Sequence, residues 1–388
     1  MHDTGLHSGI GECRVDAVLF ERTFALDYRT ALWIGTAVIV SYTFLGGFLA
    51  VSWTDAVQGS LMFIALIAVP VMATIEIGGW NAAVSTIGAL DVGMLDAFSG
   101  MSMAAIISLM AWGLGYFGQP HILARFMAIR ASEEVPTACV IGMGWMVISL
   151  YGAISTGFIA VGYFGGTPLA NPETAFIVLT QALFTPWVAG CILAAVLAAI
   201  MSTVDSQLLV SSSAVAEDLY RAFLRKAAGD RELVWVGRGA VVAIALIAAH
   251  IASDPGSRVL ALVAHAWAGF GAAFGPTVIF SLLWSKTTRN GVLAGMATGA
   301  VTVVVWANFE GGVFDLYEIL PGFLAGSAAI VVVSLLGREP PPEVRETFAR
   351  IQSKRCPDHT VSVQFQGSNS LILLCLWPLT MAVRVFVK

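Results

Sequence analysis

The chain has 388 residues, of which 57% are hydrophobic and only 12% are charged. Its mean hydropathy of +0.82 excludes an ordinary soluble domain, in which about a quarter of the residues are charged. The net charge of −5 is small, so the distribution of the charges is more informative than their sum. Five cysteines contain no C-x-x-C pair, which argues against a zinc site or a disulfide framework. The composition predicts an integral membrane protein.

Nine apolar runs follow one another along the chain, each long enough to cross a hydrocarbon layer about 30 Å thick as a helix. They lie at residues 31–51, 56–76, 101–118, 137–164, 186–213, 234–252, 259–284, 290–308 and 316–336. Runs this long and continuous do not fit barrel strands. The predicted fold class is therefore all-α, with a nine-span membrane domain at 31–336 between an N-terminal segment, 1–30, and a tail, 337–388.

The basic residues predict the orientation of these spans. Lysines and arginines follow the third, fifth, seventh and ninth runs, whereas the four opposite connections together contain only Arg258. The positive-inside rule makes the basic side, and with it the C-terminal tail, cytoplasmic. An apolar run within 368–387 contains Pro378 and is either an interfacial segment, a tenth span or frame-shifted sequence.

The fifth run carries polar side chains where a membrane span tolerates them least. Ser202, Thr203, Asp205 and Ser206 occupy about one helical turn. An unpaired carboxylate in hydrocarbon costs at least about 2.5 kcal/mol, so Asp205 is expected to face a pathway, a partner or an ion. Hard cations such as Na⁺ and proton relays both use oxygen atoms, and the cluster therefore predicts coupled transport. A passive channel is disfavoured because the cluster is local and forms no ring or continuous lining.

Two of the runs contain signals that interrupt helices. The third ends in WGLGYFGQP and the seventh contains WAGFGAAFGP, so each has three glycines before a proline. Clustered glycine and proline weaken a helix, and in a membrane such breaks are typical of secondary transporters. Glycines in spans also serve close packing, which remains the alternative. The G-x-G-x-x-G in the third run follows no strand, so it does not indicate a dinucleotide site.

Signatures of an enzyme are missing from the sequence. It contains no H-E-x-x-H, no G-x-S-x-G and no phosphate-binding loop. His265, inside the seventh run, is either a proton carrier or a histidine held by a hydrogen bond. We therefore expect a protein that is not an enzyme.

Four blocks of the sequence resemble the sodium:solute symporter family, and within it the bacterial sodium/proline symporters. They read YTFLGGFLAVSWTDAVQGSLM, AWGLGYFGQPHILARFMA, LAAVLAAIMSTVDSQLLVSSSAVAEDLYRAFLRK and AWAGFGAAFGPTVIFSLLW. The resemblance runs from about Val18 to about Phe348. It implies a leucine-transporter-like fold with two inverted repeats in a bacterial plasma membrane. The implied activity is alternating-access symport of L-proline with Na⁺ as the coupling ion, without nucleic acid or an obligate protein partner.

The resemblance also implies roles for residues of the fifth run. Ser202 and Thr203, with the backbone carbonyl of Ala199 one turn earlier, match the sodium ligands of the family. The alternative is that both hydroxyls only bond back to a carbonyl of their own helix. Asp205 and Ser206 are expected to orient this site or to line the inner ion pathway.

A further aspartate, Asp55, matches a family residue on the inward ion route. Its alternative role is to complement the helix dipole at the start of the second span.

For the substrate, Trp112, Tyr116 and Pro120 lie at i, i+4 and i+8, on one face of an α-helix. The resemblance places that face against the proline site, where an aromatic wall suits an apolar pyrrolidine ring. Trp267, Phe270 and Phe274 in the seventh run are candidates for an outer lid, although aromatic residues in spans mostly serve packing.

The chain departs from the family pattern at its N-terminal end. The first three family helices and most of the fourth have no counterpart here, and they include the first broken helix. The chain is therefore expected to be truncated relative to the family and, as written, inactive in transport. The alternatives are a sodium-coupled symporter of another small solute and a non-transporting membrane fragment or sensor scaffold.

Overall fold

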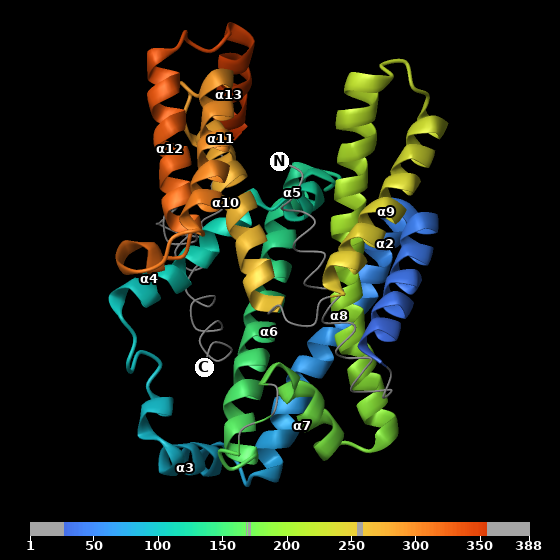
Figure 1. The fold of residues 1–388 in the computed structure, drawn as a ribbon, viewed down its shortest axis with the longest axis vertical. Coiled ribbons are helices and arrows are strands. Elements are labelled where there is room, and N and C mark those ends of the chain that lie inside the picture. The colour runs from blue at the N-terminus through green and yellow to red at the C-terminus, as the bar shows by residue number, and fades with distance from the viewer. Residues whose placement is uncertain (1–26, 168, 170–171, 254–258, 355–388) are drawn as a thin grey trace. The chain divides into compact units, whose positions relative to one another are not determined.

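The computed structural model describes residues 27–354, apart from 168, 170–171 and 254–258. Every regular element in this part of the chain is helical, and no strand occurs in it (Figure 1). The predicted all-α fold class is therefore confirmed. Most of the N-terminal segment 1–30 and the whole apolar run at 368–387 lie outside the described residues.

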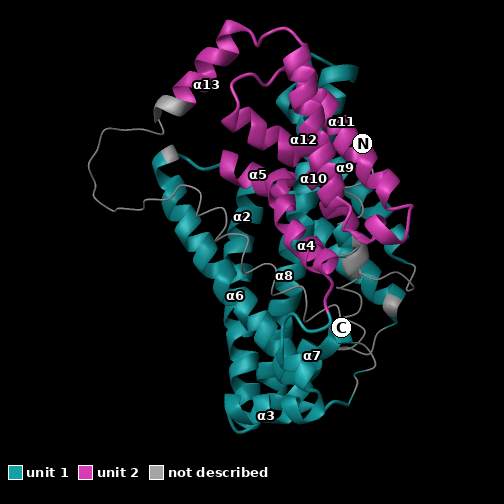
Figure 2. Cartoon of the chain, turned by 90° about the vertical axis from the view of Figure 1, so that its left-hand side faces the viewer, with its two compact units in different colours: residues 1–100, 128–264, 381–388 teal, residues 101–127, 265–380 magenta. Residues whose placement is uncertain are grey.

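The helices fall into two compact units, which we describe separately (Figure 2). Unit 1 contains residues 1–100, 128–264 and 381–388, and unit 2 contains residues 101–127 and 265–380. The elements of unit 1 are α2 (Tyr28–Glu76), α3 (Trp80–Leu90), η1 (Val92–Leu95), η3 (Ser132–Glu134), α6 (Val135–Tyr163), η4 (Pro172–Thr174), α7 (Ala175–Leu183), α8 (Pro186–Ser213), η5 (Ala214–Leu224) and α9 (Asp230–Ala252). Those of unit 2 are α4 (Met103–Ala111), η2 (Trp112–Gly118), α5 (Pro120–Met127), all but the first turns of α10 (Val259–Leu283), α11 (Arg289–Trp306), η6 (Gly312–Asp315), α12 (Ile319–Leu336) and α13 (Pro342–Lys354).

Six helices of the described part are long and apolar enough to cross a membrane. They are Arg29–Glu76, Val135–Tyr163, Pro186–Leu224, Asp230–Ala252, Val263–Leu283 and Ile319–Leu336. The sequence predicted nine spans, and the two sets differ at three places. One helix, α2, covers the first two predicted spans, α4 and η2 divide the third, and α11 is not among the six.

The long helix α2 consists of two helical segments that meet at Gly47, visible as two blue helices in Figure 1. Gly47 has φ 62° and ψ −171°, a combination that is open essentially to glycine. The sequence placed the boundary between the first two spans at residues 51–56. The chain instead turns at Gly47, because this residue can adopt a backbone conformation that its neighbours cannot.

In unit 1, α8 packs against both α2 and α9 (Figure 1). Ile39 of α2, Leu193 and Val204 of α8 and Val241 of α9 belong to one buried apolar cluster. Close van der Waals packing of these side chains holds the three helices together. This packing fixes α8, which carries the polar cluster of the fifth predicted span.

In unit 2, α11 packs closely against α12, and small residues allow this close approach. A Cβ added to Gly322 of α12 would lie 2.6 Å from Cγ2 of Val303 on α11 and 2.9 Å from Cβ of Ala272 on α10. Close approach of helices at small residues is typical of membrane proteins, where packing has to replace the hydrophobic drive between helices.

The two predicted helix breaks have different outcomes. The break in the third span is confirmed, because α4 ends at Ala111, a 3₁₀-helix follows, and α5 begins at Pro120. The break in the seventh span is wrong, because α10 continues through Pro276. Glycines of α10 serve packing instead: a Cβ on Gly275 would lie 2.7 Å from the ring of Phe323, and one on Gly271 2.7 Å from Cα of Gly115.

Candidate functional site

The hydroxyl groups of Ser202 and Thr203 lie together on α8 and point at one carbonyl. Ser202 Oγ donates to the Ala199 carbonyl oxygen at 2.9 Å, and Thr203 Oγ1 donates to the same oxygen at 3.2 Å. The three expected sodium ligands are therefore neighbours, and the hydroxyls also make the back-bonds that the alternative interpretation predicts. A hydroxyl that donates its hydrogen keeps two lone pairs, so these contacts leave oxygen lone pairs for a cation.

Asp205 is the charge-bearing residue of this cluster, and it is fully buried. The residue has no exposed surface, and Ser206 is 5% exposed. Tyr42 donates its hydroxyl to Oδ2 of Asp205 at 3.1 Å, and Ser206 Oγ lies 3.3 Å from Oδ1. Hydrogen bonds of this kind offset the cost of burying a carboxylate.

Tyr42 is a site residue that the sequence analysis did not identify. Its hydroxyl also lies 3.3 Å from the carbonyl oxygen of Met201 on α8. Tyr42 precedes Asp205 by 163 residues, so no local pattern links the two. The only available signal was a tyrosine inside an apolar run.

Asp55 lies in the second segment of α2, about two helical turns beyond the break at Gly47. It is half-buried, and its charge interacts with that of Asp205. The sequence analysis considered Asp55 to lie at the start of the second span, where it could complement the helix dipole. That placement is wrong, because the dipole effect is confined to the first turn and the segment begins earlier.

The three substrate candidates do not share an α-helical face, which corrects the sequence analysis. Trp112 and Tyr116 lie in the 3₁₀-helix η2, and Pro120 opens α5. A 3₁₀-helix has three residues per turn, so residues at i and i+3 align whereas those at i and i+4 diverge. Trp112, Gly115 and Gly118 therefore form one row, and Tyr116 points away from it.

Trp112 and Tyr116 are nevertheless brought together, because both contact the indole of Trp267. The rings of Trp112 and Trp267 are stacked with centroids 5.6 Å apart, and Tyr116 meets Trp267 edge-on at 4.8 Å. The other two candidates for the outer lid, Phe270 and Phe274, contact one another with ring centroids 6.1 Å apart.

Two further residues join the aromatic cluster, and the sequence analysis identified neither. Tyr317 stacks on Trp112 with ring centroids 5.9 Å apart. Gln119, which is 3% exposed, donates from Nε2 to the carbonyl oxygens of Gly115 and Trp267, each at 3.3 Å.

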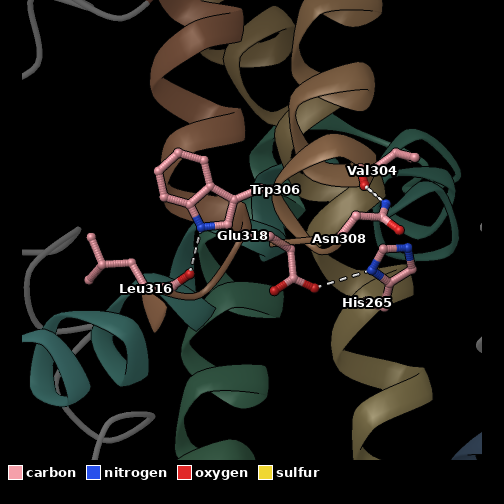
Figure 3. A network of polar contacts seen from close by, with 6 residues as sticks. All are labelled: His265, Val304, Trp306, Asn308, Leu316 and Glu318. Carbon is pink, nitrogen blue, oxygen red and sulfur yellow. Dashed lines mark hydrogen bonds and ion pairs between the residues drawn. The ribbon is translucent and has the colours of Figure 1, made fainter. Parts of the chain in front are cut away.

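His265 is held by a hydrogen bond near the start of α10. Its Nδ1 lies 3.2 Å from Oε1 of Glu318, the N-cap residue of α12 (Figure 3). The contact agrees with the interpretation of His265 as a hydrogen-bonded histidine. The proposed ion residues belong to unit 1 and the proposed substrate residues to unit 2.

Comparison with known proteins identifies the family. The sequence profile of the sodium:solute symporter family matches residues 12–299. The sodium/proline symporter of Salmonella typhimurium is 55% identical over 340 residues, which cover 86% of this chain and 67% of that protein. The sodium/proline symporter of Escherichia coli is 54% identical over 339 residues, with the same coverage of both chains. The high-affinity proline transporter PutP of Bacillus subtilis is 50% identical over 334 residues, covering 85% of this chain and 70% of that one.

The fold is also found among solved structures. A Na⁺-coupled sialic acid symporter in its substrate-bound, outward-open state superposes with a TM-score of 0.66 and 15% identity, covering 87% of this chain and 74% of that one. At this level of identity the likeness concerns the fold, and it confirms the predicted transporter architecture. Together with the apolar helices, these matches make the protein a multi-pass membrane protein and a transporter, not an enzyme. The chain belongs to the sodium:solute symporter family.

Proposed function

We propose that this protein is a sodium-coupled symporter of L-proline that works by alternating access. The observation that carries the proposal is the 55% identity to a sodium/proline symporter over 86% of the chain. The chain spans about two thirds of the length of that relative. The polar cluster on α8 supports the same function, because it offers several oxygen atoms within one turn, at which Asp205 and Ser206 are buried.

The sodium site is formed by the carbonyl of Ala199 and the hydroxyls of Ser202 and Thr203. Both hydroxyls already lie within hydrogen-bonding distance of the Ala199 carbonyl oxygen. Na⁺ prefers oxygen ligands, and neutral hydroxyls and carbonyls bind it without forming a permanent ion pair in the membrane.

Asp205, Ser206 and Asp55 form the inner ion pathway of the proposal. Two carboxylates whose charges interact favour a cation near them, since the cation relieves their mutual repulsion. Hydrogen bonds from Tyr42 and Ser206 hold Asp205 in one orientation.

Trp112, Tyr116 and Pro120 form the substrate wall. Aromatic faces suit the apolar ring of proline, and the 3₁₀ segment offers backbone groups to the ammonium and carboxylate ends. Trp267, Phe270 and Phe274 close this wall as an outer lid.

We place residues 31–336 in a bacterial plasma membrane as the transporter domain, between the N-terminal segment 1–30 and a cytoplasmic tail, 337–388. Basic residues around α5, at the end of η5 and before α11 support this orientation. The exposed apolar surface, which includes Trp187 at 89% exposure, faces lipid. No nucleic acid or obligate protein partner enters the proposal.

The test is uptake of labelled L-proline by proteoliposomes that contain this chain, with and without an inward Na⁺ gradient. The sequence analysis led us to expect an inactive chain, but the 55% identity to a sodium/proline symporter favours activity, and we expect uptake that requires the gradient. In Ser202→Ala/Thr203→Ala we expect this uptake to need a higher Na⁺ concentration. Ser60→Ala is the matched control, because Ser60 Oγ makes the same kind of back-bond, to the Ala56 carbonyl at 2.7 Å. Folded, inserted protein without Na⁺-dependent uptake would refute the proposal.

A further inference from the structure

The indole of Trp267 is hydrogen-bonded to the residue at which α4 changes into η2. Its Nε1 donates to the carbonyl oxygen of Trp112 at 2.9 Å. Trp112 is both the C-cap of α4 and the first residue of the 3₁₀-helix. Carbonyl groups at a helix end need an outside donor, and in a membrane no bulk water supplies one.

The other end of η2 is tied to the same residue. Gln119, which follows η2 directly, donates from Nε2 to the carbonyl oxygen of Trp267 at 3.3 Å. Its Nε2 also lies 3.3 Å from the carbonyl oxygen of Gly115, in the middle of the segment. The indole of Trp267 thus donates a hydrogen bond to Trp112, the first residue of η2. The backbone carbonyl of Trp267 accepts one from Gln119, the residue that follows η2.

Between these two hydrogen bonds the indole ring fills the space above Gly115. A Cβ on Gly115 would overlap the ring of Trp267. Trp112 and Gly115 lie one 3₁₀ turn apart, so the ring that stacks on Trp112 also covers Gly115. Gly115 therefore leaves the space that the indole occupies.

The same ring sets the positions of the two aromatic side chains of η2. Trp112 is stacked on it with an interplanar angle of 17°, and Tyr116 meets it edge-on at 83°. Both arrangements are favourable for aromatic pairs. Neither ring can turn without losing its contact to Trp267.

We infer that Trp267 is the positioning residue of the substrate wall, and that it determines selectivity for ring size by holding the 3₁₀ segment and the rings of Trp112 and Tyr116. The selectivity part rests on the proposed function, because it takes these two rings as the substrate wall. Trp267 exerts this effect through η2, in addition to its place in the proposed outer lid.

The first experiment measures hydrogen exchange of the amides at 112–119 in purified, ligand-free protein. In Trp267→Phe, which keeps a ring but loses the N–H, we expect about three- to tenfold faster exchange there, the effect of losing one hydrogen bond. The matched control is Trp306→Phe, because Trp306 Nε1 donates to the carbonyl oxygen of Leu316 at 3.0 Å, outside η2 (Figure 3). Unchanged exchange in Trp267→Phe, or an equal increase in Trp306→Phe, would overturn the positioning role.

The second experiment measures Na⁺-dependent binding of labelled L-proline and its displacement by azetidine-2-carboxylate and pipecolate, the four- and six-membered homologues. We expect Trp267→Phe to reduce discrimination between the rings about fivefold or more, whereas Trp306→Phe keeps it. Wild-type discrimination in Trp267→Phe, together with altered discrimination in Trp112→Ala, would refute the selectivity role. If Trp112→Ala and Tyr116→Ala both bind proline normally, the proposed substrate wall fails, and hydrogen exchange still decides whether Trp267 holds η2.

Discussion

The phenolic oxygen of Tyr42 lies 3.1 Å from Oδ2 of Asp205, and this contact joins α2 to α8 at a carboxylate with no exposed surface. A buried carboxylate is costly unless donors surround it. Tyr42 and Ser206 supply two such donors, one to each oxygen. The contact therefore explains how α8 can keep an aspartate in the middle of an apolar helix.

Replacing Tyr42 with phenylalanine tests the strength of this contact. Tyr42→Phe leaves one oxygen of a buried carboxylate without its donor, so we expect a loss of about 1.5–3 kcal/mol in the free energy of unfolding. Thermal unfolding of the purified protein in detergent measures the loss. Tyr151→Phe is the control, because Tyr151 is 66% exposed on α6. Equal midpoints for the two variants would contradict a stabilising role of the Tyr42 hydroxyl.

The hydroxyl pair on α8 gives a prediction about sodium affinity. Removing both ligands in Ser202→Ala/Thr203→Ala should raise the half-saturating Na⁺ concentration of proline uptake about tenfold or more, equivalent to about 1.4 kcal/mol. Uptake at a series of Na⁺ concentrations measures this value. Ser60→Ala should leave it unchanged, since Ser60 back-bonds within α2 in the same way. A normal Na⁺ dependence in the double variant would mean that the hydroxyls only satisfy their own helix.

The break in α2 predicts opposite effects for two glycines of one helix. Gly47→Ala forces a side chain into φ 62°, so we expect it to cost about 1–3 kcal/mol of stability. Gly59→Ala should be neutral or stabilising by up to about 1 kcal/mol, because its Cβ would meet nothing within 4 Å and alanine favours the helix. Unfolding midpoints of the two variants provide the comparison. A Gly47→Ala variant as stable as Gly59→Ala would contradict the strained turn.

His121, directly after Pro120 in α5, predicts a dependence of stability on pH. Burial lowers the pKa of its imidazole to about 4, and the charge of Arg125 lowers it further. Between that pKa and the ordinary value of 6.5, the unfolded chain binds more protons than the folded one. The contribution is therefore fully present above about pH 6.5 and is lost as the pH falls towards 4.

His121→Gln should remove this slope, so the stability of the wild type relative to the variant should fall as the pH is lowered from 7 to 4.5. Unfolding midpoints at several pH values measure the difference. His250→Gln, which removes an exposed imidazole, controls for the loss of a histidine as such. A constant difference between wild type and His121→Gln across this range would show that His121 does not carry the effect.

Long apolar runs were sufficient to predict most helices, because length and hydropathy are properties of one segment. The helix α8 begins and ends at the predicted residues, 186 and 213. The contacts within the candidate sites could not be predicted from the sequence in this way. Tyr42 reaches Asp205 across 163 residues, and Trp267 reaches Trp112 across 155, so neither pair leaves a periodic pattern.

The structural role of the clustered glycines was the hardest feature to predict, because glycine has two different roles in this protein. In η2 clustered glycine accompanies a change of helix type, whereas in α10 it makes room for neighbours such as Phe323. The two sequences look alike, and only tertiary packing separates them. The prediction that Trp112 and Tyr116 share one helical face was wrong for a related reason. Residues at i and i+4 lie on one face of an α-helix but not of a 3₁₀-helix.

The helix type of η2 also has a mechanical consequence. Seven residues extend about 14 Å as a 3₁₀-helix but only about 10.5 Å as an α-helix, because the rise per residue is 2.0 Å in one and 1.5 Å in the other. Rewinding the segment would therefore draw α4 and α5 together by about 3.5 Å without breaking the chain. It would also rotate Tyr116 towards the row that Trp112 occupies. A change of helix type in η2 would therefore change its length by a defined amount, and the contacts of the Trp267 indole favour the longer, 3₁₀ form.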